Sequence, residues 1–295
     1  MQTISITILP EDDGKKVKTV LKYRLGFSSH AIGGLTRTET GIRVNGQRAF
    51  STVRLHTGDV LTAEIGDRKP SETEIIPCDW PLDIVYEDEY LLVVNKPAGM
   101  VALASSFLPE TPTVAGALAY QKGEASVFHV VNRLDKGTTG LMTVAKSGYV
   151  HNLLRKLLHS GEFYREYRGI CVGCPQPENG TIDLPIGRAD DSAIARCIRP
   201  DGAPSVSRYE VLEKTDRFSL LKLLPQTGRT HQLRLHMSAI GHPLVGDWLY
   251  GTEDTELIAR AALHSFALHL KHPVTGEMLE LYAPLPDDMQ RLMPR

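Results

Sequence analysis

The sequence predicts an α+β protein in two domains, a small mixed unit followed by a larger one built mainly on an antiparallel sheet. Most apolar runs are short and alternate with polar residues, as β-strands do, while only a few segments show helical spacing. At 295 residues the chain exceeds the usual size of one domain. Residues 67–82, which are rich in prolines and charges, are expected to link the two parts.

Residues 1–66 are expected to form the smaller domain. The expected elements are a strand at 3–9, a helix at 17–25, a second helix from 28 or 29, a strand at 41–46 and a strand at 58–65. Gly26 ends the first helix, and a serine at 28 or 29 can cap the second. The strand at 41–46 enters an Asn-Gly turn, a strong hairpin signal. Two small helices and a hairpin make a compact unit.

Positive charge is concentrated in this N-terminal part. Residues 1–70 hold 11 Lys and Arg against 7 Asp and Glu, about +4, and the whole chain is −2, which leaves the remainder about −6. Such asymmetry is typical of a segment that meets a polyanion. A small domain can also reach this charge with a solvated basic face, and that alternative stays open.

The larger domain, residues 83–295, is expected to be rich in strands. Expected strands lie at 84–86, 91–94, 130–131, 141–145, 163–172, 181–188, 193–199, 206–213 and 218–225, and expected helices at 114–120, 148–160 and 230–240. Ser147 and Gly161 have the residue types of helix caps, and Gly241 closes the last helix. Mixed strands with a few helices on them predict a largely antiparallel sheet.

Composition places the chain among soluble globular proteins. Hydrophobic residues make up 42% and charged residues 23%, and no apolar run approaches the ~20 residues of a membrane span. The N-terminus lacks the basic start and apolar core of a signal peptide, so we expect a cytoplasmic protein without a membrane partner. Cys171 and Cys174 have C-x-x-C spacing without a second close pair, and we interpret them as structural thiols. The histidines lack metal-ligand spacing, so no required metal is expected.

The stretch from His129 to Lys146 holds the most chemistry. Two apolar runs, 130–131 and 141–145, flank a polar loop that contains Asp135. A polar loop held between two buried strands is typical of catalytic loops. Taken alone, this loop fits better as a turn in which the Asp caps its own backbone. The rest of the chain favours the catalytic interpretation.

The loop sequence R-L-D-K-G-T-T-G resembles the signature of the RluA-type pseudouridine synthases. Further motifs occur in that family's order along the chain: N-K-P-A-G at 95–99, R-E-Y at 165–167, Q-T-G-R-T-H-Q-L-R-L-H at 226–236, G-H-P-L-V-G-D at 241–247, L-Y-G at 249–251 and L-H-S at 263–265. The resemblance runs from about residue 82 to the C-terminus. Several motifs in one order are far more specific than any single motif.

The resemblance implies the catalytic roles. The family's catalytic Asp corresponds to Asp135, which acts near ribose C1′ either as a nucleophile or as a base that removes the 2′ hydrogen. A carboxylate shielded from water needs a nearby cation to stay ionised, and the Arg of T-G-R, here Arg229, is implied as that cation. Tyr167, the Tyr of R-E-Y, is implied to stack on the uracil and to help remove the C5 proton. Without the family context, sheet packing is the better interpretation of this tyrosine.

Four further motif residues have two interpretations each. Arg133 and Lys136 either contact phosphate or brace the loop. Lys96 either reaches a phosphate or holds its own loop. Leu263 packs either beside the base or within the core.

The loop departs from the usual family form, H-R-L-D-x-D-T-S-G. Asn132 stands where His is common, Gly137 where Asp is common, and Thr139 where Ser is common. Asn retains some hydrogen bonds of His, and Thr retains the hydroxyl, whereas the glycine loses a carboxylate. Since the three implied catalytic residues are present, we expect activity to be retained.

Residues 1–66 resemble the S4 RNA-binding domain, whose pattern includes L-x-S-R, V-N-G and G-D-x-I. The corresponding places read F-S-S-H at 27–30, V-N-G at 44–46 and G-D-V-L at 58–61. His30 replaces the usual Arg, and two adjacent glycines make the second helix irregular. We expect salt-dependent, largely sequence-independent contacts with phosphates from Lys18, Lys22, Arg24 and Arg37.

The sequence therefore predicts an RNA pseudouridine synthase that acts as a monomer on structured RNA, with ribosomal RNA favoured and transfer RNA as the alternative. The product is an isomer of the substrate, so no cofactor is needed. Flipping the target base out costs about a few kcal/mol, which contacts of a basic domain can offset. The rival interpretations are a non-catalytic RNA-binding or ribosome-assembly protein on the same fold, and a glycosidic hydrolase, which ordinarily needs a second carboxylate.

Overall fold

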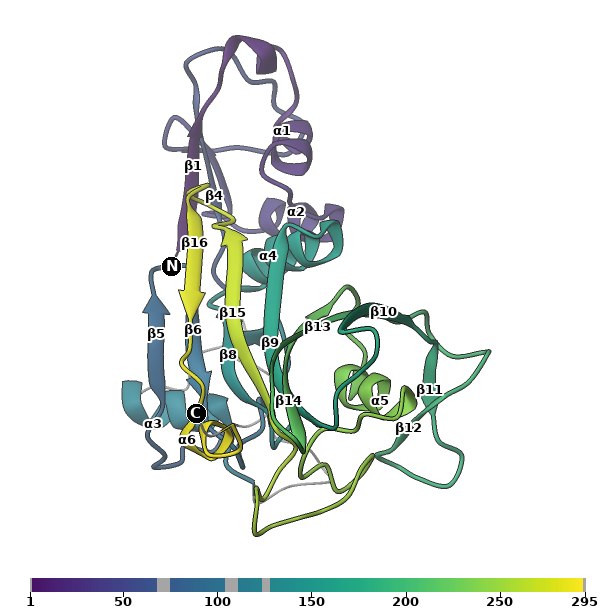
Figure 1. The fold of residues 1–295 in the computed structure, drawn as a ribbon. Coiled ribbons are helices and arrows are strands. Elements are labelled where there is room, and N and C mark those ends of the chain that lie inside the picture. Colours follow the sequence, from purple (N-terminus) through teal and green to yellow (C-terminus); the bar gives the residue numbers. More distant parts are fainter. Residues whose placement is uncertain (1, 68–74, 104–110, 124–127, 294–295) are drawn as a thin grey trace.

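The computed structural model describes residues 2–67, 75–103, 111–123 and 128–293. Within these residues the chain forms a four-stranded sheet, a ten-stranded sheet and a two-stranded ribbon, with helices packed on the larger two (Figure 1). This mixture confirms the predicted α+β class.

The N-terminal residues form a small mixed unit. Its antiparallel strands, in spatial order, are β1 (Thr3–Thr7), β4 (Val60–Glu64), β2 (Ile42–Val44) and β3 (Gln47–Arg48), and its helices are η1 (Pro10–Asp12), α1 (Val17–Tyr23) and α2 (Ser29–Thr36). Apolar residues of both longer helices and of β2 and β4 share one buried cluster, so the helices cover one face of this sheet.

Local signals in this unit act as predicted. Asn45 and Gly46 both have positive φ, 52° and 80°, which is the geometry of a tight hairpin turn. The Ser28 hydroxyl accepts a hydrogen bond from the Ala31 amide and caps α2.

The large sheet has the strand order β10-β13-β14-β9-β15-β8-β6-β5, with β16 on β15 and β7 on β8. Its strands are β5 (Asp83–Glu87), β6 (Leu91–Lys96), β7 (His129–Val130), β8 (Thr139–Ala145), β9 (Phe163–Val172), β10 (Asn179–Asp183), β13 (Val206–Lys214), β14 (Phe218–Pro225), β15 (Leu263–Lys271) and β16 (Met278–Tyr282). Among the described strand pairings only β8 with β15 is parallel. The ribbon consists of β11 (Ile186–Arg188) and β12 (Arg196–Ile198).

Helices cover both faces of the middle of this sheet. On β6 and β8, alternate residues enter two different apolar clusters, one shared with α3 (Val114–Lys122) and the other with α4 (Gly148–Ser160). This explains why both strands are almost fully buried rather than half-exposed. Farther along, α5 (Gln232–Ala239) lies inside the curve of β10, β13 and β14, and α6 (Asp287–Gln290) lies near the C-terminus (Figure 1).

The predicted helix boundaries hold on α4 and shift on α5. Ser147 caps α4, and Gly161 ends it in the left-handed region at φ 83°. The helix predicted from residue 230 begins at Gln232, because His231 before it is itself left-handed, at φ 57°.

Only the second half of the predicted linker, residues 67–82, can be assigned to a unit. Residues 68–74 lie outside the described part of the chain. Residues 75–82 pack against the cluster of α3: the Cys78 amide donates to the Gly116 carbonyl, and Leu82 is buried. A side chain at Gly116 would come within 2.4 Å of the Ile76 carbonyl oxygen, so the glycine permits this close approach. This half of the linker is part of the larger unit.

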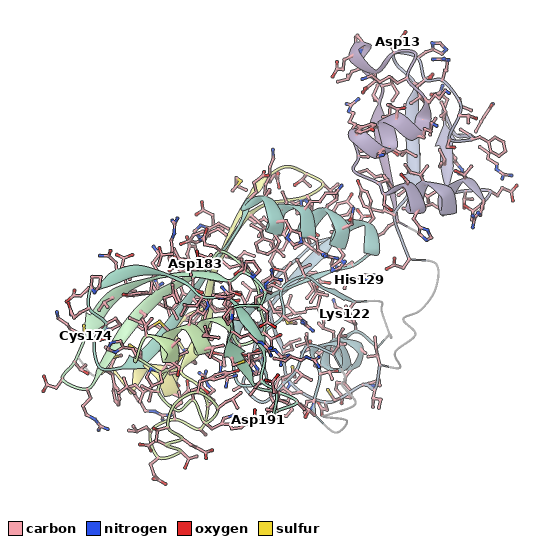
Figure 2. The ribbon with its side chains drawn as sticks, turned by 90° about the vertical axis from the view of Figure 1, so that its right-hand side faces the viewer. Asp13, Lys122, His129, Cys174, Asp183 and Asp191 are labelled. Atoms are coloured by element: carbon pink, nitrogen blue, oxygen red, sulfur yellow. The ribbon has the colours of Figure 1, made fainter. Side chains whose placement is uncertain are left out.

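The two units meet at α4. The Tyr149 hydroxyl donates to the Leu25 carbonyl at 2.7 Å, and Lys156 donates to the Gly26 carbonyl at 2.9 Å. The Tyr149 ring also lies 4.3 Å, centroid to centroid, from the Phe27 ring. Figure 2 shows the small unit at one end of the molecule, with Asp13 at its far tip.

Three features of the described residues bear on function. No helix among them is long and apolar enough to cross a membrane. In the same part of the chain, no three His, Cys, Asp or Glu residues are grouped so that they could hold a metal ion. Cys171 and Cys174 are free thiols, and the first of them is buried.

Candidate active site

The signature loop, residues 131–138, joins β7 to β8 as the predicted strand, loop and strand. Buried Asn132 fastens the loop to β8, since its Oδ1 accepts from the Thr143 amide at 2.8 Å and its Nδ2 donates to the Leu141 carbonyl at 3.3 Å. The Thr138 amide donates to the Asp135 carbonyl and closes a turn. Asn132 therefore binds backbone groups at the place where the family usually has His.

The base of the loop is fixed to β15. The Thr139 hydroxyl lies 2.8 Å from Nδ1 of buried His264, whose Nε2 lies 3.1 Å from the Ala283 carbonyl. Because a carbonyl can only accept, Nε2 carries the proton and Nδ1 accepts from the threonine. Burial lowers the pKa of His264 to about 4, which keeps the ring neutral. The hydroxyl retained at Thr139 thus has a defined structural partner.

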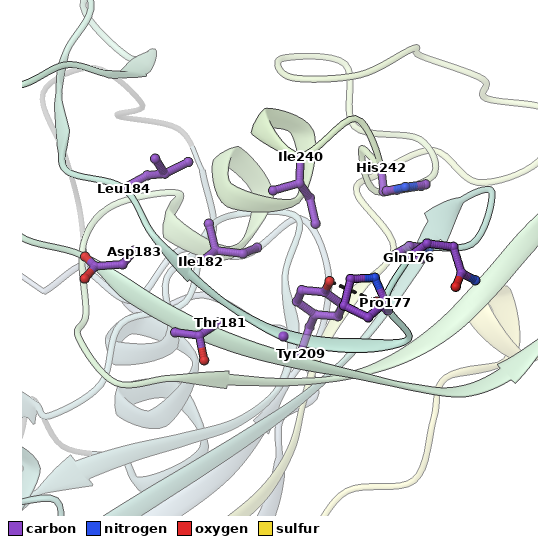
Figure 3. A pocket seen from close by; sticks show the side chains of 11 residues that line it. Gln176, Pro177, Thr181, Ile182, Asp183, Leu184, Tyr209, Ile240 and His242 are labelled. Atoms are coloured by element: carbon purple, nitrogen blue, oxygen red, sulfur yellow. Dashed lines mark hydrogen bonds between the residues drawn. The ribbon is translucent and has the colours of Figure 1, made fainter.

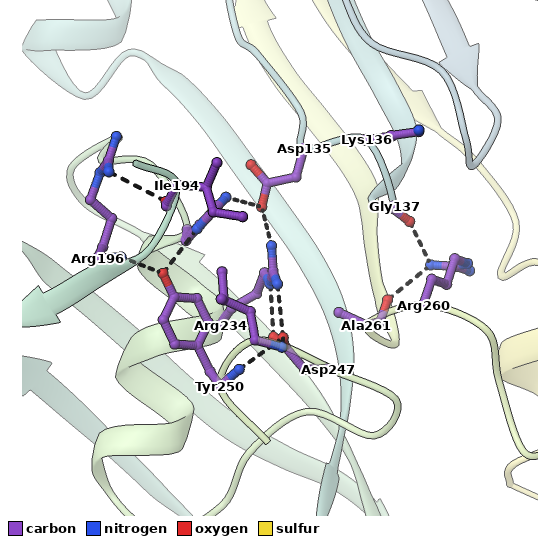
Figure 4. A network of polar contacts seen from close by, with 12 residues as sticks. Asp135, Lys136, Gly137, Ile194, Arg196, Arg234, Asp247, Tyr250, Arg260 and Ala261 are labelled. Carbon is purple, nitrogen blue, oxygen red and sulfur yellow. Dashed lines mark hydrogen bonds and ion pairs between the residues drawn. The ribbon is translucent and has the colours of Figure 1, made fainter. Parts of the chain in front are cut away.

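Asp135 faces a buried ion pair. Arg234 donates from Nη1 to Oδ2 of Asp135 at 3.2 Å, and from Nε and Nη2 to both carboxylate oxygens of Asp247 at 2.7 and 2.8 Å (Figure 4). Asp247 and Arg234 are buried, whereas the Asp135 side chain is 27% exposed. The buried Asp247 carboxylate thus orients the Arg234 guanidinium, while the Asp135 carboxylate on its other side stays accessible.

Charge balance favours the ionised form of this network. Burial by itself would lower the pKa of Arg234, but the hydrogen bonds and charge of Asp247, together with Asp135, raise it overall. The guanidinium therefore stays protonated at any working pH and provides a permanent cation beside Asp135.

The partner implied for Asp135 was Arg229, and the structure does not place it there. Arg229 is exposed, and its Nε donates to the Pro204 carbonyl at 3.3 Å. It lies two residues before the left-handed His231, outside α5, whereas Arg234 lies within the buried part of that helix. The cation at the site comes from L-R-L-H rather than from T-G-R. Both arginines lie in one motif, and sequence alone could not separate them.

His231 and Tyr250 also approach Asp135, and the sequence prediction missed both. His231 Nε2 lies 3.9 Å from Asp135 Oδ2, and its Nδ1 lies 2.9 Å from the Tyr250 hydroxyl, which accepts from the Arg196 amide. Burial lowers the pKa of His231, although Asp135 acts in the opposite direction. The motifs Q-T-G-R-T-H and L-Y-G contained these residues, but their spacing gave no indication of a contact.

Tyr167 lies on β9 in the same apolar cluster as Leu134, Leu233 and Leu263. Leu134 precedes Asp135 and Leu233 precedes Arg234, so the chain neighbours of these two polar residues pack against Tyr167 in one cluster. Burial raises the pKa of Tyr167, while the charge of Arg165 acts to lower it. The phenol is therefore protonated near neutral pH. Leu263 is buried within this core, in agreement with the packing interpretation.

Lys96 is enclosed under the signature loop, so a contact with phosphate is not available in this conformation. Its side chain is 0% exposed, and its Nζ donates to the carbonyls of Pro97, Met100 and Lys136 at 2.8, 2.9 and 3.3 Å. Burial lowers the pKa of Lys96 to about 7, while Asp135 acts to raise it. Lys96 holds the loop, which was one of its two interpretations.

Arg260 supports the loop from the opposite side. Its Nη1 donates to the carbonyls of Gly137 and Ala261 at 3.2 and 3.1 Å (Figure 4). The same Nη1 donates to the Leu263 carbonyl at 3.1 Å, and Nε and Nη2 bind Asp288 at 2.7 and 2.9 Å. The sequence prediction missed this residue, because it lies outside the family's motifs.

Arg133 and Lys136 of the loop are exposed. Within the described part of the chain neither forms an ion pair, so both are free to meet an anion. Their contact with phosphate remains a prediction.

The basic residues expected to bind RNA in the small unit divide into two groups. Lys18, Lys22 and Arg37 are exposed. Arg24 instead binds Asp12 at 2.6 Å, next to Lys15, and these contacts lower the pKa of the buried Asp12 carboxyl, with the Lys15 hydrogen bond as the largest cause. Arg24 therefore stabilises the unit and is less available to a phosphate.

Two hollows in the described part of the chain are lined by residues other than Asp135. One hollow, of about 530 Å³, lies along β10 and is lined by Ile182, Tyr209, Ile240 and His242 (Figure 3). The Tyr209 hydroxyl donates a hydrogen bond to the Pro177 carbonyl there. Another of about 500 Å³ lies behind the signature loop, beside Lys96 and His264.

Comparisons with known proteins agree with this geometry. Residues 90–239 match the family described as RNA pseudouridylate synthase. The uncharacterized RNA pseudouridine synthase YjbO of Bacillus subtilis is 37% identical over 279 residues, covering 93% of this chain and 98% of that protein. The ribosomal large subunit pseudouridine synthase D of Haemophilus influenzae is 39% identical over 249 residues, covering 79% and 75%.

The chain belongs to the RNA pseudouridylate synthase family.

Solved structures of the family agree as well. Human RNA pseudouridylate synthase domain containing 1 is 32% identical, with a TM-score of 0.57 over 69% of this chain and 83% of that one. The chain is thus an RluA-type enzyme, an isomerase that converts uridine in RNA to pseudouridine. The mixed, mostly antiparallel sheet and the motif order agree with that assignment.

Proposed function

We propose that this RNA pseudouridine synthase modifies uridine in ribosomal RNA, with Asp135 as its catalytic carboxylate. The observation that carries this proposal is the contact of the accessible Asp135 with the buried pair of Arg234 and Asp247. Several relatives named as ribosomal large subunit pseudouridine synthases support the choice of substrate.

The reaction breaks the bond between uracil N1 and ribose C1′, turns the base, and forms a bond between C5 and C1′. The C5 proton leaves and N1 gains a proton, so atoms balance without a cofactor. Asp135 acts at the ribose, either by bonding to C1′ or by removing the 2′ hydrogen. Arg234 keeps the carboxylate ionised and oriented in either case.

Tyr167 is proposed to contact the uracil. Tyr167 and Leu263 are both buried in one apolar cluster, so a flipped base would pack on the ring only after the residues that cover it move aside. Since burial raises the pKa of Tyr167, the phenol is a poor base in the resting enzyme. It would accept the C5 proton only with help from a cation, and Arg165 lies two residues away on the same face of β9.

Residues 1–66 are proposed to be an S4-like RNA-binding domain, with residues 83–295 as the catalytic domain. The two helices on a four-stranded sheet, the excess of basic residues and the exposed Lys18, Lys22 and Arg37 support this division. RNA contacts here would offset part of the cost of base flipping.

Pseudouridine mapping tests the proposal. Ribosomal and transfer RNA would be mapped from cells that lack the protein and are complemented with wild type or with Asp135→Asn. We expect a ribosomal pseudouridine to vanish and only wild type to restore it. A change confined to transfer RNA would contradict the substrate, and restoration by Asp135→Asn would contradict the catalytic residue.

A further inference from the structure

The outer face of the small sheet carries a polar row that crosses all four strands. Ser5 lies opposite Thr62, Thr62 opposite Arg43, and Arg43 opposite Arg48. Residues directly opposite each other in antiparallel strands project to the same face. The row therefore presents two hydroxyls and two guanidinium groups side by side. The Ser5 and Thr62 hydroxyls lie 2.9 Å apart.

Placing two arginines opposite each other is unfavourable. Opposite residues have Cβ atoms about 5 Å apart, and like charges at this separation destabilise a sheet. Among the described ion pairs neither Arg43 nor Arg48 has a carboxylate partner, and both are exposed. Glu64, in the next row of this face, is buried. An external anion would relieve the repulsion.

An exposed aromatic ring completes the surface. The Phe50 side chain is 52% exposed, and the Arg48 guanidinium lies 5.1 Å from its ring centroid. A phenylalanine this exposed loses the benefit of burial, while its free face can stack on a nucleobase. Arginine beside an aromatic ring is the combination that binds unpaired nucleotides.

This face is separate from the surface expected from the sequence. The opposite face of the sheet is covered by α1 and α2 through their shared apolar cluster. Lys18 and Lys22 belong to the α1 side, whereas Arg43 and Arg48 belong to the β2–β3 hairpin on the uncovered side. Neither hairpin arginine was among the residues expected from the sequence to bind RNA.

We propose that the outer face of this sheet, formed by Arg43, Arg48, Phe50, Ser5 and Thr62, binds an unpaired stretch of RNA. The arginines and hydroxyls contact consecutive phosphates, and the phenylalanine stacks on a base. The proposal rests on the RNA substrate of the proposed function and adds where that RNA is held. The surface selects single strands over duplex, because a paired base cannot reach the ring.

The test uses the full-length protein with the double change Arg43→Gln and Arg48→Gln. Affinity for a fluorescein-labelled single-stranded RNA of about 16 nucleotides would be measured by anisotropy against salt concentration. We expect binding to weaken by about tenfold at physiological salt. The slope of log K against log salt should become shallower by about 1.4, because the variant no longer neutralises two phosphates of a single strand.

A matched control removes the same charge elsewhere. The double change Arg217→Gln and Arg291→Gln also replaces two exposed arginines, one of which lies over an aromatic ring, Phe218. We expect this control to change the slope by less than about 0.5, since only phosphates that the protein touches release counterions. Equal effects of the two double variants would overturn the proposed surface, because they would indicate a general charge effect.

A second variant tests the stacking contact. Phe50→Ala should weaken binding of the single strand at least about fivefold with an unchanged salt slope, and should leave affinity for a duplex of equal length unchanged. An equal loss on single strand and duplex would overturn the stacking role. Wild type would also be tested for binding to anionic phospholipid vesicles. If the arginine changes abolish vesicle binding while RNA affinity is retained, the surface would be assigned to a membrane instead.

Failure of this surface is distinguishable from failure of the proposed function. Pseudouridine formation at saturating ribosomal RNA depends on Asp135 and not on the hairpin, so Arg43→Gln with Arg48→Gln should keep its maximal rate. Asp135→Asn should lose the rate and keep the RNA affinity. An arginine variant with normal affinity would therefore overturn the surface without affecting the catalytic assignment.

Discussion

Arg234 is the residue on which the candidate site depends most directly. Asp247 takes two of its donors, so the remaining Nη1 is held in the direction of Asp135. A buried Arg–Asp pair gains little net stability, because desolvation offsets most of the attraction. Its value here is orientation, since a pre-set guanidinium needs no rearrangement when the substrate arrives.

Substitution at the two arginines of the Q-T-G-R-T-H-Q-L-R-L-H motif distinguishes their roles. Arg234→Lys keeps the charge but loses the fork that binds Asp247 and Asp135 together, so we expect the maximal rate to fall at least about 100-fold. Arg229→Lys at the exposed position should change it less than about threefold. Steady-state kinetics with circular dichroism as a folding control would measure this. A larger loss at Arg229 would restore the partner first implied by the sequence.

Lys96 makes stability depend on pH. Its ammonium is enclosed, with a pKa of about 7 against a usual value of 10.5. Between these values the unfolded chain binds more protons, so the free energy of unfolding should rise with pH by up to about 1.4 kcal/mol per pH unit. Below pH 7 the full cost of burying the charge is present. Urea titrations of wild type and Lys96→Met between pH 7 and 10 should show this slope in wild type alone. Parallel curves for the two proteins would contradict the shift.

At the scale of elements, regular patterns were predictable and side-chain directions were not. The apolar run of β8, the N-cap of α4 at Ser147 and its end at Gly161 depend on neighbouring residues, so the sequence reveals them. The partner of Asp135 depends on where α5 begins, and that start is set by the left-handed backbone of His231. Such a conformation is uncommon for a residue other than glycine, and although histidine adopts it more often than most residues, most histidines do not.

The parallel contact of β8 with β15 depends on a missing side chain. Gly140 has φ 102°, and a Cβ there would lie 2.3 Å from the Ser265 carbonyl oxygen. We expect Gly140→Ala to reduce the free energy of unfolding by about 3 kcal/mol or more, because backbone strain and a backbone clash combine.

Gly161→Ala is the matched control for that change. Gly161 also has positive φ, 83°, but a Cβ there meets nothing within 4 Å. Its loss should be about 1 kcal/mol, the cost of the left-handed conformation alone. If chemical denaturation shows equal losses in the free energy of unfolding for the two variants, the backbone conformation, rather than the contact with β15, would explain why position 140 requires glycine.

For the whole molecule, the contacts between the two units support the proposal that the larger unit carries the chemistry and the small unit contributes to RNA binding. The residues proposed for catalysis lie in or beside one apolar cluster of the large sheet, while the small unit contacts α4 on the other face of that sheet. Weakening that contact should therefore alter the capture of RNA and not the chemistry. The boundary between the two units was only partly predictable from the sequence, because residues 75–82 lack periodicity and yet pack against α3.

Tyr149→Ala tests this division. The change removes the hydrogen bond to Leu25 and the ring contact with Phe27, so the small unit should lose its fixed position. We expect KM for ribosomal RNA to rise about tenfold, because a mobile domain must be ordered again on binding, while kcat at saturation stays within about twofold. Faster hydrogen exchange at residues 25–27 would show that the contact between the two units has weakened. Tyr149→Phe loses only one hydrogen bond of about 1 kcal/mol, so it should show a smaller rise in KM and a smaller change in exchange. A fall in kcat with unchanged KM would mean that the small unit acts on the catalytic loop through α4 rather than by holding RNA.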